Sequence, residues 1–292
     1  MRQRIALIIC SVLFLAGFFS GCINNGEDDQ NNNDDEIIYE GNVWIMNIEG
    51  DKQNQITSDG AGYNNPNYDP KGQTILFSRG NEIWIMDTDG KNKVNLTSNE
   101  NILHPYYTHN QNELIGILDW NKIINYNISN ASYDLIFDYE GEGELWYPSY
   151  SPNNLKIIYQ NHVGIGDAKN TNQICIYNIP DEENYIVVDN ANSPSFLDDN
   201  WILFSENYSI CKFNLQTKEK ISLTDNKINS FPKANKDGTK IVYCSQSDGG
   251  KNIDIWIMDS DGSNKIKLTN DSDYNYNSPN FSPDGNKIIY ER

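Results

Sequence analysis

The chain has 292 residues, of which 22 are basic and 41 acidic, so its formal net charge is −19 at pH 7. Such an acidic surface repels phosphate backbones, which argues against nucleic-acid binding and against unaided docking on anionic lipid. The five cysteines include no Cys-x-x-Cys pair or other ligand spacing. Cys175, Cys211 and Cys244 fall in apolar runs, where we expect buried free thiols. We therefore expect no metal and no other cofactor.

Residues 1–21 have the features of a secretory signal peptide. Arg2 and Arg4 precede an apolar run, Ile5–Phe19, that is too short for a comfortable membrane span. The small residues that follow it, Ser20 and Gly21, resemble the cleavage site of a lipoprotein. The pattern predicts cleavage before Cys22 and lipidation of Cys22, and two acyl chains suffice for stable anchoring. An ordinary signal peptide or an uncleaved anchor is the alternative.

Residues 22–41 are expected to form a disordered tether between the lipid and the folded part of the chain. Asn, Asp, Glu and Gln dominate residues 23–36, and such a composition cannot form an apolar core. The carboxylates repel one another and extend the segment. We expect an exported protein at the cell membrane or envelope, facing the periplasm or the exterior.

Residues 42–292 consist of a repeated unit of about 40 residues. Each unit has a proline before a short apolar run, a turn, a second apolar run, a third run of the type seen at 253–259 (IDIWIMD), and a Gly-containing turn before a fourth run. The repeated proline occurs at Pro66, Pro105, Pro148, Pro194, Pro232 and Pro279. Six copies of four short apolar runs predict an all-β, six-bladed β-propeller of four-stranded antiparallel blades.

The order of the runs also predicts how the ring closes. We name the four strands of a blade A to D, with the proline in strand A. The propeller begins with a C–D pair at 43–57 and finishes with an A–B pair at 279–291. These two halves can complete one blade from both ends, which removes free sheet edges. Residues 37–39 (Ile-Ile-Tyr) resemble a further strand B, and their place at this seam is open.

At these runs and turns the chain resembles the TolB-like β-propeller repeat, a relative of WD-repeat blades. The resemblance covers residues 42–292 and is weaker where His109-Asn110-Gln111 and Leu197-Asp198-Asp199 replace the Pro-Asp-Gly turn. It implies a propeller fold and says little about function. TolB-type proteins carry an α/β domain before the propeller and work with the Tol–Pal system. Only a tether precedes the blades here, so we expect a generic interaction module.

The predicted meander sorts the connections onto two faces. The short A–B and C–D turns share one face, named here the turn face, and the longer B–C and D–A connections share the other, the loop face. Variable loops on a rigid scaffold often carry binding sites. We therefore expect binding at the connections 138–147, 161–173 and 270–278. His104 precedes a repeat proline and should face the mouth of the central channel. The candidate ligand-binding residues are His104, Tyr139, Trp146, Tyr147, Tyr274 and Tyr276.

These observations favour a binding protein over an enzyme. Aromatic rings among acidic residues suit an envelope protein, a peptide or a glycan as partner, and we expect a monomer. No nucleophile elbow, phosphate-binding loop or second matching histidine occurs, so no catalytic residue is assigned and the chain is not expected to be an enzyme. The alternatives are an enzyme, a lyase or hydrolase acting on an extracellular polysaccharide or peptide through His104, and tyrosines without a binding role.

Overall fold

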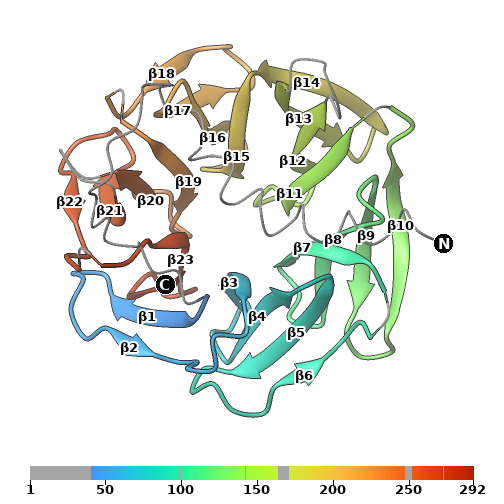
Figure 1. Cartoon of the computed structure of the whole chain (residues 1–292). Coiled ribbons are helices and arrows are strands. Elements are labelled where there is room, and N and C mark those ends of the chain that lie inside the picture. Colours follow the sequence, from blue (N-terminus) through green and yellow to red (C-terminus); the bar gives the residue numbers. More distant parts are fainter. Residues whose placement is uncertain are drawn as a thin grey trace, which may run out of the picture. The chain divides into compact units, whose positions relative to one another are not determined.

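The computed structural model describes residues 41–98, 100–141, 143–163, 171–225, 227–246, 252–271 and 273–292. Within them the chain forms 24 strands and no helix, in six four-stranded antiparallel sheets arranged in a ring around a central axis (Figure 1). The predicted six-bladed propeller is confirmed. In these ranges we find no apolar helix of membrane-spanning length. The signal segment, Cys22, the tether as far as residue 40 and the Ile-Ile-Tyr segment lie outside the described residues.

The two inner strands of each blade carry the repeat proline and the following apolar run (Figure 1). The A strands are β3 (Tyr63–Tyr68), β7 (Ile102–Tyr107), β11 (Glu144–Tyr150), β15 (Ala191–Phe196), β19 (Asn229–Ala234) and β23 (Asn277–Phe281). The B strands are β4 (Thr74–Arg79), β8 (Glu113–Leu118), β12 (Lys156–Val163), β16 (Trp201–Glu206), β20 (Lys240–Gln246) and β24 (Lys287–Glu291).

The two outer strands of each blade differ in regularity. The C strands are β1 (Val43–Asn47), β5 (Glu82–Asp87), β9 (Lys122–Asn127), β13 (Thr171–Asn178), β17 (Ser209–Asn214) and β21 (Ile253–Asp259). The D strands are β2 (Asn54–Gln55), β6 (Val94–Asn95), β10 (Ser132–Asp138), β14 (Glu183–Asp189), β18 (Lys220–Ser222) and β22 (Ile266–Lys267). We number the blades from 1, which combines β1, β2, β23 and β24, to 6, which ends with β22.

The length of strand D depends on a threonine. In the four blades with a short strand D, a threonine hydroxyl accepts the backbone N–H of a residue in strand C, as Thr57 does from Val43 at 2.9 Å and Thr97 from Ile83 at 2.8 Å. Blades 3 and 4 lack this threonine, and their D strands continue for seven residues. A side-chain hydroxyl thus takes over a bond that a longer strand D would otherwise make.

The ring closes as the order of the runs predicts. Strand β1 pairs with β24 from Val43 opposite Glu291 to Asn47 opposite Lys287. Asn42 and Arg292 then exchange two backbone hydrogen bonds of 2.9 and 3.0 Å. The two ends of the colour scale accordingly meet in blade 1 (Figure 1).

The core of the propeller lies between the blades. Six clusters of buried apolar side chains occur among the described residues, and each joins side chains of two neighbouring blades. Strands packed on both faces need apolar side chains on both faces, which explains continuous runs such as Ile75–Phe77, all three of which are fully buried. Because every blade shares its core with two neighbours, we expect the ring to unfold as a unit.

A bulge in strand A shapes the central channel. The residue before each repeat proline has a left-handed backbone, with φ from 47° to 54° in all six blades. The A–B register shifts at this point in all six blades. The six bulged residues are Asn65, His104, Tyr147, Ser193, Phe231 and Ser278. A bulge bends the strand and redirects a side chain, so these six positions form a ring of comparable sites.

Candidate functional site

Three aromatic side chains of the bulged ring meet at the channel. The rings of His104 and Tyr147 lie 4.6 Å apart between centroids in an edge-to-face arrangement. Tyr147 also meets the ring of Phe231 edge to face at 5.8 Å. These residues belong to blades 3, 4 and 6, so the contact between Tyr147 and Phe231 spans blade 5. In blade 5 the bulged residue is the small Ser193, which leaves room for this contact.

Trp146 extends this group. Its ring stacks on His104 with a centroid distance of 5.1 Å and an interplanar angle of 27°. The rings of Trp120 and His162 also lie beside this indole, with centroid distances of 6.2 and 6.1 Å. We name the six residues His104, Trp120, Trp146, Tyr147, His162 and Phe231 the channel cluster. His162 lies one residue before the end of strand B of blade 4 and contacts Asn172 through its Nδ1, which places it toward the loop face.

Two nitrogen atoms of the channel cluster are buried without a hydrogen-bond partner among the described residues. They are Nδ1 of His104 and Nε1 of Trp146. An unsatisfied buried polar group costs about 1–3 kcal/mol. Apolar rings of similar size would fill this space without that cost, so packing alone does not account for a histidine and a tryptophan here.

Burial also determines the protonation states of His104 and Tyr147. It lowers the pKa of His104 to about 4, so its imidazole is neutral at pH 7. Burial raises the pKa of Tyr147 well above its usual range, and the nearby Tyr106 and Glu291 add to the effect. The site therefore presents a neutral imidazole and a protonated phenol between aromatic faces. Such groups can stack and form hydrogen bonds, and the imidazole is a weak base.

A buried carboxylate lines the same channel and was missed by the sequence reasoning. Glu291 is 1% exposed and accepts a hydrogen bond of 2.5 Å from the backbone N–H of Asn65, the bulged residue of the next blade. Gln160 accepts the equivalent N–H, that of Ser193, at 2.9 Å. In both cases the strand-B residue beside the bulge thus accepts the backbone N–H of the bulged residue in the next blade. Each of these two strand-B residues pairs with the strand-A residue that directly precedes the bulge. An alignment of the repeats in this register could have identified both residues.

The structure brings together three of the six predicted ligand-binding residues, namely His104, Trp146 and Tyr147. Tyr139 lies beside this group, where its hydroxyl accepts a hydrogen bond of 2.8 Å from Asn161. Tyr274 packs elsewhere, with the Arg292 guanidinium 3.6 Å from its ring centroid.

Two expectations about these positions are corrected. Tyr276 is not a rim residue: it is 1% exposed and packs in a core cluster, with Tyr290 at 5.9 Å. Trp146 does not lie in a connection, because β11 already begins at Glu144 and pairs Trp146 with Gln160. The strands extend further into the predicted connections than the turn residues alone indicated. Residues 164–170 of the predicted 161–173 connection lie outside the described residues.

The described parts of the chain contain no group of three or more His, Cys, Asp or Glu side chains that could hold a metal ion. Cys175, Cys211 and Cys244 are buried free thiols, as expected from their apolar positions. Burial raises the pKa of Cys175 to about 12, which disfavours the reactive thiolate. The site thus depends on aromatic, imidazole and hydroxyl groups.

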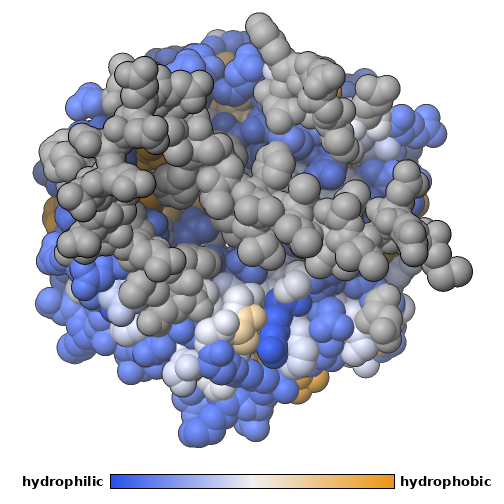
Figure 2. Space-filling view, in the orientation of Figure 1, coloured by the Kyte–Doolittle hydropathy of each residue, from blue (hydrophilic) through white to orange (hydrophobic). Residues whose placement is uncertain are grey.

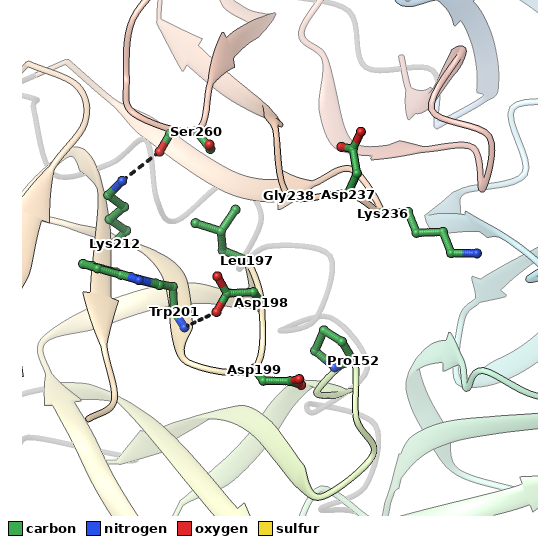
Figure 3. A pocket seen from close by; sticks show the side chains of 10 residues that line it. All are labelled: Pro152, Leu197, Asp198, Asp199, Trp201, Lys212, Lys236, Asp237, Gly238 and Ser260. Carbon is green, nitrogen blue, oxygen red and sulfur yellow. Dashed lines mark hydrogen bonds between the residues drawn. The ribbon is translucent and has the colours of Figure 1, made fainter. Parts of the chain in front are cut away.

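A cavity lies away from the channel cluster, on the turn face, and the sequence reasoning did not find it (Figure 3). Its volume is about 360 Å³, and turns of blades 4, 5 and 6 enclose it. It is lined by Pro152, Leu197, Asp198, Asp199, Trp201, Lys212, Lys236, Asp237, Gly238 and Ser260. The only signal in the sequence was the loss of the Pro-Asp-Gly turn at Leu197-Asp198-Asp199. The visible surface in Figure 2 is mainly hydrophilic, in keeping with the acidic composition.

Comparison with known proteins identifies the fold. No family model and no curated protein matches the chain. Among solved structures, a protein assigned as TolB from Agrobacterium tumefaciens superposes with a TM-score of 0.70 at 17% identity, covering 86% of this chain and 97% of that one. An oligogalacturonate lyase in complex with manganese gives 0.58 at 11% identity, covering 78% and 89%. A chain of a nidogen–laminin complex gives 0.60 at 9% identity, covering 85% and 97%.

The expectation that the chain is not an enzyme is corrected by these matches. Structures with the same fold include oligogalacturonate lyases and a puromycin-hydrolysing peptidase. Their identities of 10–11% establish a shared fold and no shared reaction. The absence of a familiar motif was therefore too weak a reason to exclude catalysis. By its six blades, its closed ring and its match to the Agrobacterium protein, the chain has the TolB-like six-bladed β-propeller fold.

Proposed function

We propose that this protein is a lipid-anchored propeller of the cell envelope that binds a partner at the loop-face end of its central channel. The partner is an envelope protein, a peptide or a glycan, which the propeller would hold within an envelope or transport-associated complex. A propeller suits this role because a rigid ring can carry variable contact residues at its centre.

The observation that carries the proposal is the channel cluster itself. Tryptophan and tyrosine dominate the binding energy of many interfaces, and here Trp146 and Tyr147 of blade 4 pack against His104 of blade 3. The two unpartnered ring nitrogens have no structural explanation among the described residues. The acidic composition adds a preference for basic or hydroxyl-rich partners and disfavours nucleic acid.

The anchor rests on residues 1–22 and is tested apart from binding. Replacing Cys22 with Ser should abolish lipidation and leave residues 1–21 attached, so the variant should be heavier than the processed part of the wild-type chain by the mass of this segment. Mass spectrometry of the wild-type protein should find a diacylglyceryl group on Cys22. If the wild-type protein carries no lipid on Cys22, or if the Cys22→Ser protein is cleaved as the wild type is, the lipoprotein assignment is wrong.

The binding site is tested with solubilised envelopes and variants of the channel cluster. Trp146→Phe keeps an aromatic ring, His104→Asn keeps a polar side chain, and Asn occupies the matching bulged position in blade 2 as Asn65. Any partner retained by the wild type should be bound at least tenfold more weakly by both variants. Asp89→Ala, in an exposed turn on the opposite face, is the control and should bind normally. The proposal fails if only the Asp89 variant loses the partner.

An enzyme acting at the same site is the second candidate, because the neutral His104 ring lies 4.6 Å from the ring of the protonated Tyr147. A base and a proton donor in contact can serve a lyase or a hydrolase. Turnover of an oligosaccharide or peptide that disappears in both His104→Asn and Tyr147→Phe would favour this candidate. Binding without turnover in the wild type would favour the first.

A further inference from the structure

Corresponding positions can be compared across the six blades, and blade 5 differs from the other five at the turn-face cavity. The first residue of strand B is polar in every other blade, whereas in blade 5 it is Trp201. The matching residues are Thr74, Glu113, Lys156, Lys240 and Lys287. A polar residue suffices to begin strand B at this edge of the ring, so the fold does not require a tryptophan there.

A second departure lies directly beside the first. Lys212 in strand C pairs with Leu203, two residues after Trp201. Four of the five matching positions hold isoleucine, and the fifth holds asparagine: Ile45, Ile85, Asn125, Ile176 and Ile257. The Lys212 ammonium lies 5.2 Å from the Trp201 ring centroid and donates a hydrogen bond of 3.0 Å to the backbone oxygen of Ser260 in blade 6. The lysine thereby fixes the indole at the wall of the cavity (Figure 3).

The turn before Trp201 supplies carboxylates to the same cavity. Asp198 uses Oδ1 to accept the backbone N–H groups of Asn200 and Trp201, at 2.7 and 2.8 Å. Asp199 uses its own Oδ1 to accept the N–H of Asn153 in blade 4, at 2.9 Å. One oxygen of each carboxylate thus takes part in the turns, and among the described residues the second oxygen of each accepts no hydrogen bond. Asp237 lies on the opposite wall (Figure 3).

The cavity therefore combines an apolar wall with hydrogen-bonding groups of both charges. Trp201, Leu197 and Pro152 supply apolar surface, while Asp198, Asp199, Asp237 and Lys236 supply acceptors and donors. Its volume of about 360 Å³ lies within the range of roughly 300–1,000 Å³ that is usual for small-molecule sites. An aromatic ring stacks on the apolar face of a sugar, and hydroxyl groups both donate and accept hydrogen bonds.

We propose that this cavity, built on Trp201 and the turn at Leu197–Asp199, is a binding site for a neutral carbohydrate. Three carboxylates disfavour an acidic sugar, and the two lysines disfavour a cationic side chain. The site lies on the opposite face from the channel cluster and does not depend on the function proposed above. A protein with both sites could hold a glycan on one face and a partner on the other.

Calorimetric titration of the full-length chain in detergent with maltotetraose, cellotetraose and chitotetraose tests this proposal, with tetragalacturonate as the acidic comparison. At least one neutral tetrasaccharide should bind, and tetragalacturonate should bind at least tenfold more weakly. Trp201→Thr installs the residue of blade 2 and should weaken binding at least tenfold. Tyr208→Asn, which removes a 63% exposed tyrosine of the same blade, is the matched control and should bind as the wild type does.

A second variant distinguishes a loss of binding from a loss of folding. Asp199→Asn keeps an oxygen to accept the N–H of Asn153 and removes the charge, so it should fold and weaken binding several-fold. Melting curves establish that each variant is folded before titration. The proposal is overturned if no neutral tetrasaccharide binds, if only tetragalacturonate binds, or if folded Trp201→Thr and Asp199→Asn both bind as the wild type does.

Discussion

His104 should make the propeller sensitive to mild acid. Burial lowers the pKa of this imidazole from 6.5 to about 4 in the folded chain. As the pH falls below 6.5, the unfolded chain takes up a proton that the folded chain does not accept until about pH 4. Stability is therefore lost through this window as the pH falls, and it is fully present above pH 6.5. At pH 5 the two pKa values correspond to a loss of about 2 kcal/mol relative to pH 7.5.

The perturbation that isolates this effect is His104→Asn. Asparagine tolerates the left-handed backbone at this position, where φ is 50°, and it does not titrate. Urea unfolding of both proteins at pH 7.5 and pH 5 gives four free energies of unfolding. Carboxylates that titrate in this range act on both proteins, so the difference between the proteins reports on His104. Between pH 7.5 and pH 5, the free energy of unfolding of the wild type should fall by about 2 kcal/mol more than that of the variant. This corresponds to about 4–8 °C in Tm.

His109→Gln is the control, because it removes an imidazole from an exposed turn. The Nε2 of this imidazole lies 3.3 Å from the backbone oxygen of Ser151. If the difference between wild type and His104→Asn stays constant from pH 7.5 to pH 5, burial does not keep His104 neutral. The account of His104 as a neutral imidazole in the channel cluster would then be wrong.

Three further predictions concern stability and reactivity. Arg292→Ala should lower the free energy of unfolding in urea by about 1–3 kcal/mol, because the guanidinium lies 4.5 and 3.6 Å from two aromatic rings at the seam; Lys91→Ala, at an exposed ion pair, should change it little. Gly90→Ala should cost more stability than Gly80→Ala, since its Cβ would lie 2.3 Å from a carbonyl oxygen whereas Gly80 has nothing within 4 Å; equal melting temperatures would contradict this. Cys244, which is fully buried, should react with a thiol reagent only at the rate of unfolding, and immediate labelling of the native protein would contradict its burial.

Much of the candidate site follows from position in the repeat. His104 was expected to face the mouth of the channel because it precedes a repeat proline, and Tyr147 precedes another; in the structure their ring centroids lie 4.6 Å apart. Phe231 holds the same position and could have been added by the same alignment. The contact between Tyr147 and Phe231 could not, because it depends on the small side chain of Ser193 in the blade between them. Likewise, the burial of Tyr276 depends on side chains packed around it, such as Tyr290.

The amino-acid sequence by itself determined the number of blades and the closure of the ring. Each blade is a local meander whose turns are specified by nearby Gly, Pro, Asp and Asn residues, and the phase of the first and last runs requires the two ends to pair. Only the tertiary structure decided which side chains meet. The channel cluster gathers residues from blades 3, 4 and 6, and the turn-face cavity gathers turns from blades 4, 5 and 6. Such sites depend on side chains brought together from different blades, and no local pattern records that proximity.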